Sequence, residues 1–155
     1  MVTIFFYTNK DNHPVICYDI HGNLKWEFND AQNLRYPQGI SVDSNGNVYV
    51  VSKDTNSVVI ITPNGKHCRT ILSFCDGLSN PCALHFEPTS NKLLVANKTE
   101  GISVDSNGNV YVASMDTSSG VIITLMESVA GQYCPLVMAF EVHVYCISNQ
   151  PVTSY

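Results

Sequence analysis

Hydrophobic residues recur along the chain in short runs that have the spacing of β-strands. Ile40 and Val42 alternate with polar residues, as in a strand with one buried face. Residues 47–52 (NVYVVS) and 57–62 (SVVIIT) are rich in Val, Ile and Tyr, which suit a buried pleated surface. No ten-residue segment carries an apolar stripe at helical spacing. The pattern therefore predicts an all-β chain.

Asn-Gly pairs separate several of these runs, at residues 45–46, 64–65 and 107–108. Such pairs supply the positive φ that a tight hairpin turn requires. One unit then consists of strand, turn, strand, loop, strand, turn and strand. We expect each unit to form a four-stranded antiparallel sheet.

Internal repetition identifies how the units combine. Residues 39–62 and 101–124 are identical at 20 of 24 positions. Weaker copies relate residues 81–97 to 37–52, and residues 15–28 to 58–71, so that the period is about 43 residues. One four-stranded propeller blade takes roughly 40 to 50 residues. The chain is therefore predicted to be a partial, open β-propeller built of four-stranded antiparallel blades.

The repeats also predict a division of the chain. Residues 1–124 form the partial propeller, and residues 125–155 form a divergent C-terminal tail that matches no blade. The inner strand at Ala83 is followed only 18 residues later by the next inner strand at Gly101, so two outer strands are missing there. The predicted blade remnants are about 1–36, 37–80, 81–98 and 101–124.

Composition narrows the function classes. Only 14% of the 155 residues are charged and 10% are aromatic, which excludes disorder as the main state. The net charge is −5 and the eight Lys and Arg are scattered, which disfavours a nucleic-acid surface. No secretory leader and no membrane span are predicted. The six cysteines are therefore interpreted as reduced thiols of a cytoplasmic protein.

Short segments within the repeats resemble those of a known family. Residues 37–43 (PQGISVD), 46–51 (GNVYVV) and 58–61 (VVII) are similar to NHL repeats. The segments that flank these residues further resemble the C-terminal propeller of tripartite-motif (TRIM-NHL) proteins. The resemblance implies an NHL-type propeller that binds protein or RNA targets, in a family whose RING domain recruits the ubiquitin-conjugating enzyme. The cysteines and histidines lack the paired C-x2-C spacing of a RING or B-box, so no ligase activity is carried over.

The sequence gives little support for a metal site or a catalytic site. The segments that begin at Asp43 and Asp105 are similar to calcium loops, but glycine falls at position 4 and Asp at position 12. Each Asp is instead expected to bond local backbone ahead of a hairpin. Cys68, Cys75 and Cys82 lack the close spacing of zinc ligands. With no catalytic motif present either, no metal, no cofactor and no enzymatic activity are predicted.

Binding residues are expected in the loops, because loops at the ring faces carry recognition in propellers. Arg35, Tyr36 and Lys53 are the predicted partner contacts, since Arg and Tyr are frequent at interface hot spots. Trp26 is interpreted as packing between blades. The loops concerned are residues 33–38, 52–56, 97–100 and 114–118.

These observations favour a non-catalytic protein-interaction module, the target-recognition propeller of a TRIM-NHL-like ubiquitin ligase system. Two alternatives stay open: an RNA-binding NHL propeller fragment, and the remnant of a gluconolactonase-type metal-binding propeller. An open arc leaves strand edges and apolar faces uncovered, so self-association through the open propeller edges is also expected.

Overall fold

We describe the fold from a computed structural model of the chain. It describes residues 4–9, 11, 14–76, 78–89 and 91–97, and beyond them the backbone of four further strands. Apart from one 3-10 turn (η1, Phe74–Asp76), all regular structure in this part of the chain is β. None of its helices has the length and apolar character needed to cross a membrane.

The second sheet, sheet II, is a complete four-stranded blade. Its strands are β4 (Pro37–Val42), β5 (Val48–Ser52), β6 (Ser57–Ile61) and β7 (Cys68–Leu72). They pair in sequence order, and every pair is antiparallel. β5 is buried along its whole length, because both faces of the sheet are covered. This is why its sequence reads as a continuous apolar run and does not alternate.

Sheet I precedes it and has three strands: β1 (Ile4–Thr8), β2 (Val15–Asp19) and β3 (Leu24–Phe28). They pair antiparallel in the order β1-β2-β3. The repeat aligns β2 and β3 with β6 and β7, so β1 takes the place of β5. No described strand takes the place that β4 has in sheet II.

The later strands form two further sheets. Sheet III contains β8 (Pro81–Glu87), β9 (Lys92–Asn97) and β12 (Ile123–Glu127), with β9 in the middle. Sheet IV contains β10 (Gly101–Val104), β11 (Val110–Ala113) and the short β13 (Tyr145–Cys146), which runs parallel to β11.

One strand crosses the predicted limits of the blades. β12 begins inside the predicted unit 101–124, ends inside the predicted tail and pairs with β9 of the preceding sheet. It thereby supplies a third strand to the blade in which two outer strands are missing from the sequence. The predicted division at residue 124 therefore falls within β12, and it stays a prediction.

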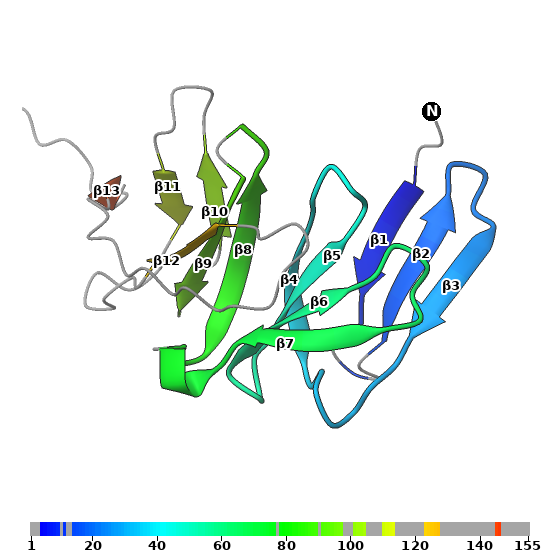
Figure 1. The fold of residues 1–155 in the computed structure, drawn as a ribbon, viewed down its shortest axis with the longest axis horizontal. Helices are drawn as coiled ribbons and strands as arrows, with labels where there is room; N and C mark the ends of the chain where they lie inside the picture. The colour runs from blue at the N-terminus through cyan, green and yellow to red at the C-terminus, as the bar shows by residue number, and fades with distance from the viewer. Residues whose placement is uncertain are drawn as a thin grey trace, which may run out of the picture.

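Sheets I, II and III stack side by side through apolar faces (Figure 1). Between sheets I and II lies a cluster that is closed to solvent: Val15, Leu34, Val48, Val50, Val59 and Ile61. Between sheets II and III, Tyr49 stacks on Phe86 with ring centroids 5.5 Å apart. Antiparallel sheets stacked in this way are propeller blades, so the predicted fold class is confirmed: an all-β, open part of a β-propeller.

Gly39, the glycine of the Pro-x-Gly segment at residues 37–39, lies where two inner strands approach each other. A Cβ at Gly39 would stand 3.0 Å from the Ala83 Cα and 3.0 Å from the Leu84 backbone nitrogen. Both are main-chain atoms, which a small side-chain adjustment cannot move. The absence of a side chain at Gly39 therefore lets β4 pack directly on β8.

Trp26 joins sheets I and II at their outer strands. Its indole Nε1 donates to the Pro63 carbonyl oxygen at 3.0 Å, and its ring lies 5.7 Å from that of Phe6. The ring also covers Gly65 in the β6–β7 turn. The interpretation of Trp26 as packing between blades is confirmed.

Gly65→Ala tests this contact against a matched glycine. Gly65 (φ +68) and Gly22 (φ +80) both hold a left-handed backbone, but a Cβ at Gly65 would lie 2.5 Å from the Trp26 ring while one at Gly22 meets nothing within 4 Å. We expect Gly22→Ala to lower the free energy of unfolding by about 1 kcal/mol through backbone strain alone. Gly65→Ala should cost about 1–3 kcal/mol more because the indole must move.

Denaturant unfolding followed by circular dichroism measures both values. Equal losses in the two variants would show that Trp26 does not hold the β6–β7 turn in place.

Candidate functional site

The connections between strands separate into two ends of the stack. Tight hairpin turns at residues 20–23, 43–47 and 62–67 lie at one end, and the longer connections at 29–36 and 73–80 lie at the other with the β5–β6 turn (Figure 1). The predicted loops 33–38 and 52–56 both belong to the second end. Residues 98–100 and 114–118 lie outside the described residues.

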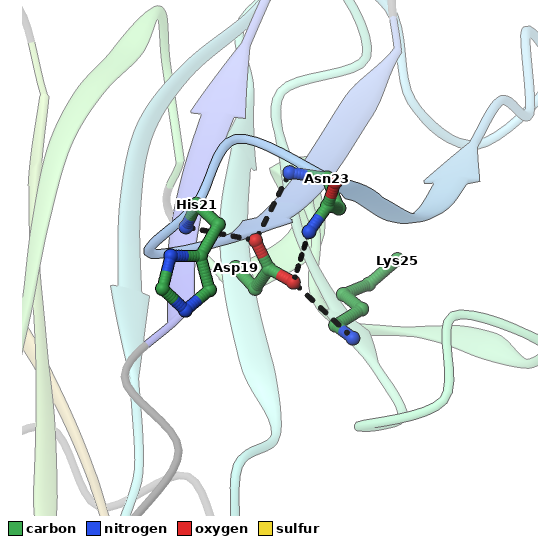
Figure 2. A network of polar contacts seen from close by, with 4 residues as sticks. All are labelled: Asp19, His21, Asn23 and Lys25. Atoms are coloured by element: carbon green, nitrogen blue, oxygen red, sulfur yellow. Dashed lines mark hydrogen bonds and ion pairs between the residues drawn. The ribbon is translucent and has the colours of Figure 1, made fainter.

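At the hairpin end, Asp19 organises its own turn (Figure 2). Its Oδ1 accepts from the backbone nitrogens of His21 at 2.9 Å and Asn23 at 3.0 Å, and its Oδ2 accepts from Asn23 Nδ2 at 3.0 Å. Lys25 Nζ lies 3.4 Å from the same Oδ2. The hydrogen bonds from Asn23, followed by those from His21 and Lys25, lower the pKa of the Asp19 carboxyl to about 2.

Asp43 repeats this arrangement in sheet II. Its Oδ1 accepts from the backbone nitrogens of Asn45 and Asn47, both at 2.9 Å. Its Oδ2 accepts from Asn47 Nδ2 at 2.8 Å and from the Tyr49 hydroxyl at 3.1 Å. Both oxygens are thus used to close the turn, and the interpretation of Asp43 as a local backbone acceptor is confirmed. The copy at Asp105 lies outside the described residues.

The described cysteines are free thiols, namely Cys17, Cys68, Cys75 and Cys82. Cys68 Sγ donates to Asp30 Oδ2 at 3.5 Å. Burial and this carboxylate raise the pKa of the Cys68 thiol to about 11, and burial also raises the pKa of Cys17. Both thiols are protonated at neutral pH and are poor nucleophiles. Among the described residues, no three His, Cys, Asp or Glu side chains gather as metal ligands would.

At the other end, the structure brings the three predicted contact residues together. Arg35 and Tyr36 come from the β3–β4 connection, and Lys53 begins the β5–β6 turn. Lys53 Nζ lies 5.6 Å from the centroid of the Tyr36 ring, in a cation–π arrangement. Arg35 is exposed, whereas Tyr36 and Lys53 are half-buried.

The buried Ser52 hydroxyl holds these loops in register. It accepts from the Arg35 backbone nitrogen at 2.8 Å and donates to the Arg35 carbonyl oxygen at 2.9 Å. The backbone nitrogen of Lys53 donates to the Tyr36 carbonyl oxygen at 3.3 Å. The three side chains are thereby displayed on backbone that a rigid sheet positions.

A third connection extends the same surface. The Asn80 backbone nitrogen donates to Asn56 Oδ1 at 2.7 Å, which ties the β7–β8 connection to the β5–β6 turn. The Asn97 side chain accepts from the Ser79 backbone nitrogen at 3.1 Å, as Ser52 does from Arg35. We call the resulting set the loop surface: Arg35, Tyr36, Lys53, Asn56 and Asn80.

Two equivalent positions on the loop surface have unusual backbone. Tyr36 (φ 53) precedes Pro37, and Asn80 (φ 48) precedes Pro81, so the fold places a left-handed residue at the entry to both inner strands. Asn tolerates this conformation well, but an aromatic residue does so at a cost of about 1 kcal/mol or more. The tyrosine at position 36 is therefore not explained by the needs of the backbone.

The sequence-based prediction omitted Asn80 and the whole β7–β8 connection. A signal for it exists in the repeat, because Asn80-Pro81 aligns with Tyr36-Pro37. The hydrogen bond from Asn80 to Asn56, in contrast, depends on the stacking angle of two sheets and has no counterpart in the sequence.

Comparison with known proteins agrees with this architecture. A family described as a beta-propeller repeat matches residues 27–57, which run from the end of β3 to the start of β6. No curated protein sequence matches the chain.

Several solved structures share the fold. Hydrazine synthase of Kuenenia stuttgartiensis aligns over 79% of this chain and 42% of its own, at 13% identity and a TM-score of 0.63. A catalytically inactive virginiamycin B lyase of Staphylococcus aureus with quinupristin covers 76% and 41%, at 17% identity and 0.54. A chain of the nidogen–laminin complex covers 79% and 59%, at 12% identity and 0.54.

The chain thus spans between 41% and 59% of the length of these structures. At such low identities the likeness concerns the fold alone. It places the described sheets among β-propellers and transfers no chemistry to them.

The Asp19 turn predicts a specific pH dependence. Because folding lowers the pKa of Asp19 from 3.8 to about 2, its ionised form stabilises the fold fully above pH 4, and this contribution is lost as the pH falls toward 2. The difference in free energy of unfolding between wild type and Asp19→Asn should therefore shrink over that range. Urea unfolding at several pH values measures it.

Asn23→Ala provides the control, since Asn23 is the largest cause of the shift. In that background the pH-dependent part of the Asp19 effect should be clearly smaller. A difference that is constant from pH 7 to pH 2 would contradict the Asp19 network.

The cysteines predict an order of alkylation. Raising the pKa of Cys68 from 9.0 to about 11 lowers its thiolate fraction about 100-fold near neutral pH. Iodoacetamide should therefore label the exposed Cys75 well before Cys68 and Cys17. Peptide mass spectrometry of the native protein measures this order. Comparable rates at Cys75 and Cys68 in the native state, matching those in denaturant, would contradict the burial of Cys68.

Proposed function

We propose that the chain is a non-catalytic protein-interaction module that contacts its partner through the loop surface. The observation that carries the proposal is Tyr36. Its backbone is left-handed, and its ring supports the Lys53 ammonium at 5.6 Å. The fold places Asn80 at the equivalent position, so the tyrosine ring with its cation is what distinguishes this site.

The chemistry of the loop surface supports the proposal. Interface hot spots are enriched in Tyr and Arg, which combine a large contact area with directional hydrogen bonds. The exposed Arg35, which precedes Tyr36 in the same connection, offers the five donors of its guanidinium. The two hydrogen bonds between Ser52 Oγ and the Arg35 backbone hold these residues in place before a partner arrives, which reduces the entropy lost on binding.

The proposal extends to the biological setting. We place the module as the target-recognition propeller of a TRIM-NHL-like ubiquitin ligase system in the cytoplasm, where free thiols such as those described here persist. Similarity of residues 37–61 to NHL repeats supports this setting. One of the similar folds was solved as part of a nidogen–laminin complex, which illustrates a propeller-containing protein assembly.

Two variants separate binding from folding. Arg35→Ala with Lys53→Ala removes both cations of the loop surface. Tyr36→Asn installs the residue that the chain uses at position 80. Because relief of backbone strain and loss of the cation–π contact oppose each other, Tyr36→Asn should change the free energy of unfolding by less than about 1 kcal/mol. Both changes should reduce partner retention at least about tenfold.

Retention is measured by affinity capture from a cell extract with quantitative mass spectrometry. Lys66→Ala with Arg69→Ala is the matched control, since both cations are exposed and lie at or beside the β6–β7 turn. Proteins held by wild type and control but lost from both loop variants support the proposal. Equal retention by all four chains would overturn it, and binding of single-stranded RNA oligonucleotides that weakens steeply with salt would replace protein by RNA as the target.

A further inference from the structure

Two Asn-Gly pairs close tight turns at the hairpin end of sheet II, at residues 45–46 and 64–65. Asn45 and Asn64 are both exposed. In each turn the glycine backbone nitrogen donates to the carbonyl oxygen three residues earlier, at 3.0 Å in the first turn and 2.9 Å in the second. The two pairs therefore share their main-chain arrangement, and the surroundings of the two Asn side chains can be compared directly.

The side chain of Asn64 is held in place. Its Oδ1 accepts from the Thr62 hydroxyl at 2.8 Å and from the Lys66 backbone nitrogen at 3.0 Å. The turn itself is covered by the Trp26 ring, whose Nε1 donates to the Pro63 carbonyl oxygen. Both the side chain and the main chain of this turn are thus restrained.

The side chain of Asn45 lacks such restraint. In the part of the chain that the structure describes, none of its side-chain atoms forms a hydrogen bond; only its backbone nitrogen does, to Asp43 Oδ1 at 2.9 Å. No aromatic ring covers the turn at Gly46, where the nearest atoms to an added Cβ belong to Pro63 at 3.4 Å, an ordinary contact. The Asn45 amide can therefore rotate toward the Gly46 nitrogen.

We propose that Asn45 is a site of spontaneous deamidation in the folded protein, and that it reacts well ahead of Asn64. The residue after Asn supplies the nucleophile of this reaction, and glycine leaves that nitrogen unhindered because it has no side chain. Hydrogen bonds that hold an Asn side chain elsewhere oppose the approach. Asn64 carries two such bonds, whereas Asn45 has none among the described residues.

The reaction needs only water. The turn first opens at the hydrogen bond from Gly46 to Asp43. The Gly46 backbone nitrogen then attacks the side-chain carbonyl carbon of Asn45, the new C–N bond closes a five-membered succinimide, and the side-chain nitrogen leaves as ammonia with the proton lost by Gly46. Water opens the ring at either carbonyl, which gives aspartate or isoaspartate at position 45.

Conversion at this position should weaken the β4–β5 hairpin. Asp43 Oδ1 accepts from the backbone nitrogens of residues 45 and 47, and isoaspartate adds one carbon to the main chain between these two donors. The product also places a second carboxylate near Asp43, which is 7% exposed and already carries its own negative charge. The modified turn can no longer satisfy Asp43 as the original turn does.

Ageing of the purified chain at 37 °C and pH 8, followed by peptide mass spectrometry, tests the proposal. Deamidation should be at least about fivefold faster at Asn45 than at Asn64 in the native protein, because two hydrogen bonds restrain Asn64. In urea the two positions should react at comparable rates. Asn107 lies in an identical local sequence, Asp-Ser-Asn-Gly-Asn, so in urea it should match Asn45.

Two variants test the cause and the consequence. Thr62→Val removes one bond to Asn64 and should accelerate its deamidation while leaving Asn45 unchanged. Asn45→Gln blocks formation of the five-membered ring, so the aged variant should retain more of its resistance to urea unfolding than aged wild type.

Three results would overturn the proposal: equal native rates at Asn45 and Asn64, a difference between them that persists unchanged in urea, or no acceleration at Asn64 in Thr62→Val. Equal losses of stability in aged wild type and aged Asn45→Gln would overturn the predicted weakening of the hairpin. All four measurements are made without a binding partner, so they are independent of the proposed function.

Discussion

The covering of apolar sheet faces is the constraint on which the rest of this structure depends. A propeller sheet is apolar on both sides, as the fully buried Val50 and Val51 on opposite faces of β5 show. Such a sheet is unstable unless a neighbour lies on each side. The small separation at Gly39, the Tyr49–Phe86 stack and the Trp26 contact with the β6–β7 turn are three ways in which neighbouring sheets meet this requirement.

Much of this architecture could be predicted from the sequence because the repeat encodes it locally. The Asp-x-x-Gly-Asn word contains its own acceptor, left-handed glycine and donors, so the turn at Asp43 follows from five residues. The continuous apolar run in β5 likewise indicates that both faces of this strand are buried. Features that are encoded by one short segment of the sequence, such as a turn or a buried strand, could therefore be predicted from it.

Features that depend on contacts between distant segments could not be predicted from the sequence. The pairing of β12 with β9 joins segments separated by a second hairpin, and no local pattern specifies it. The left-handed backbone of Tyr36 follows from the geometry at the entry to an inner strand, and tyrosine gives no hint of it. For the candidate site, the sequence predicted Arg35, Tyr36 and Lys53, and that role stays a prediction. The hydrogen bonds through Ser52 and Asn56 could not be predicted, because they depend on how the loops and sheets pack.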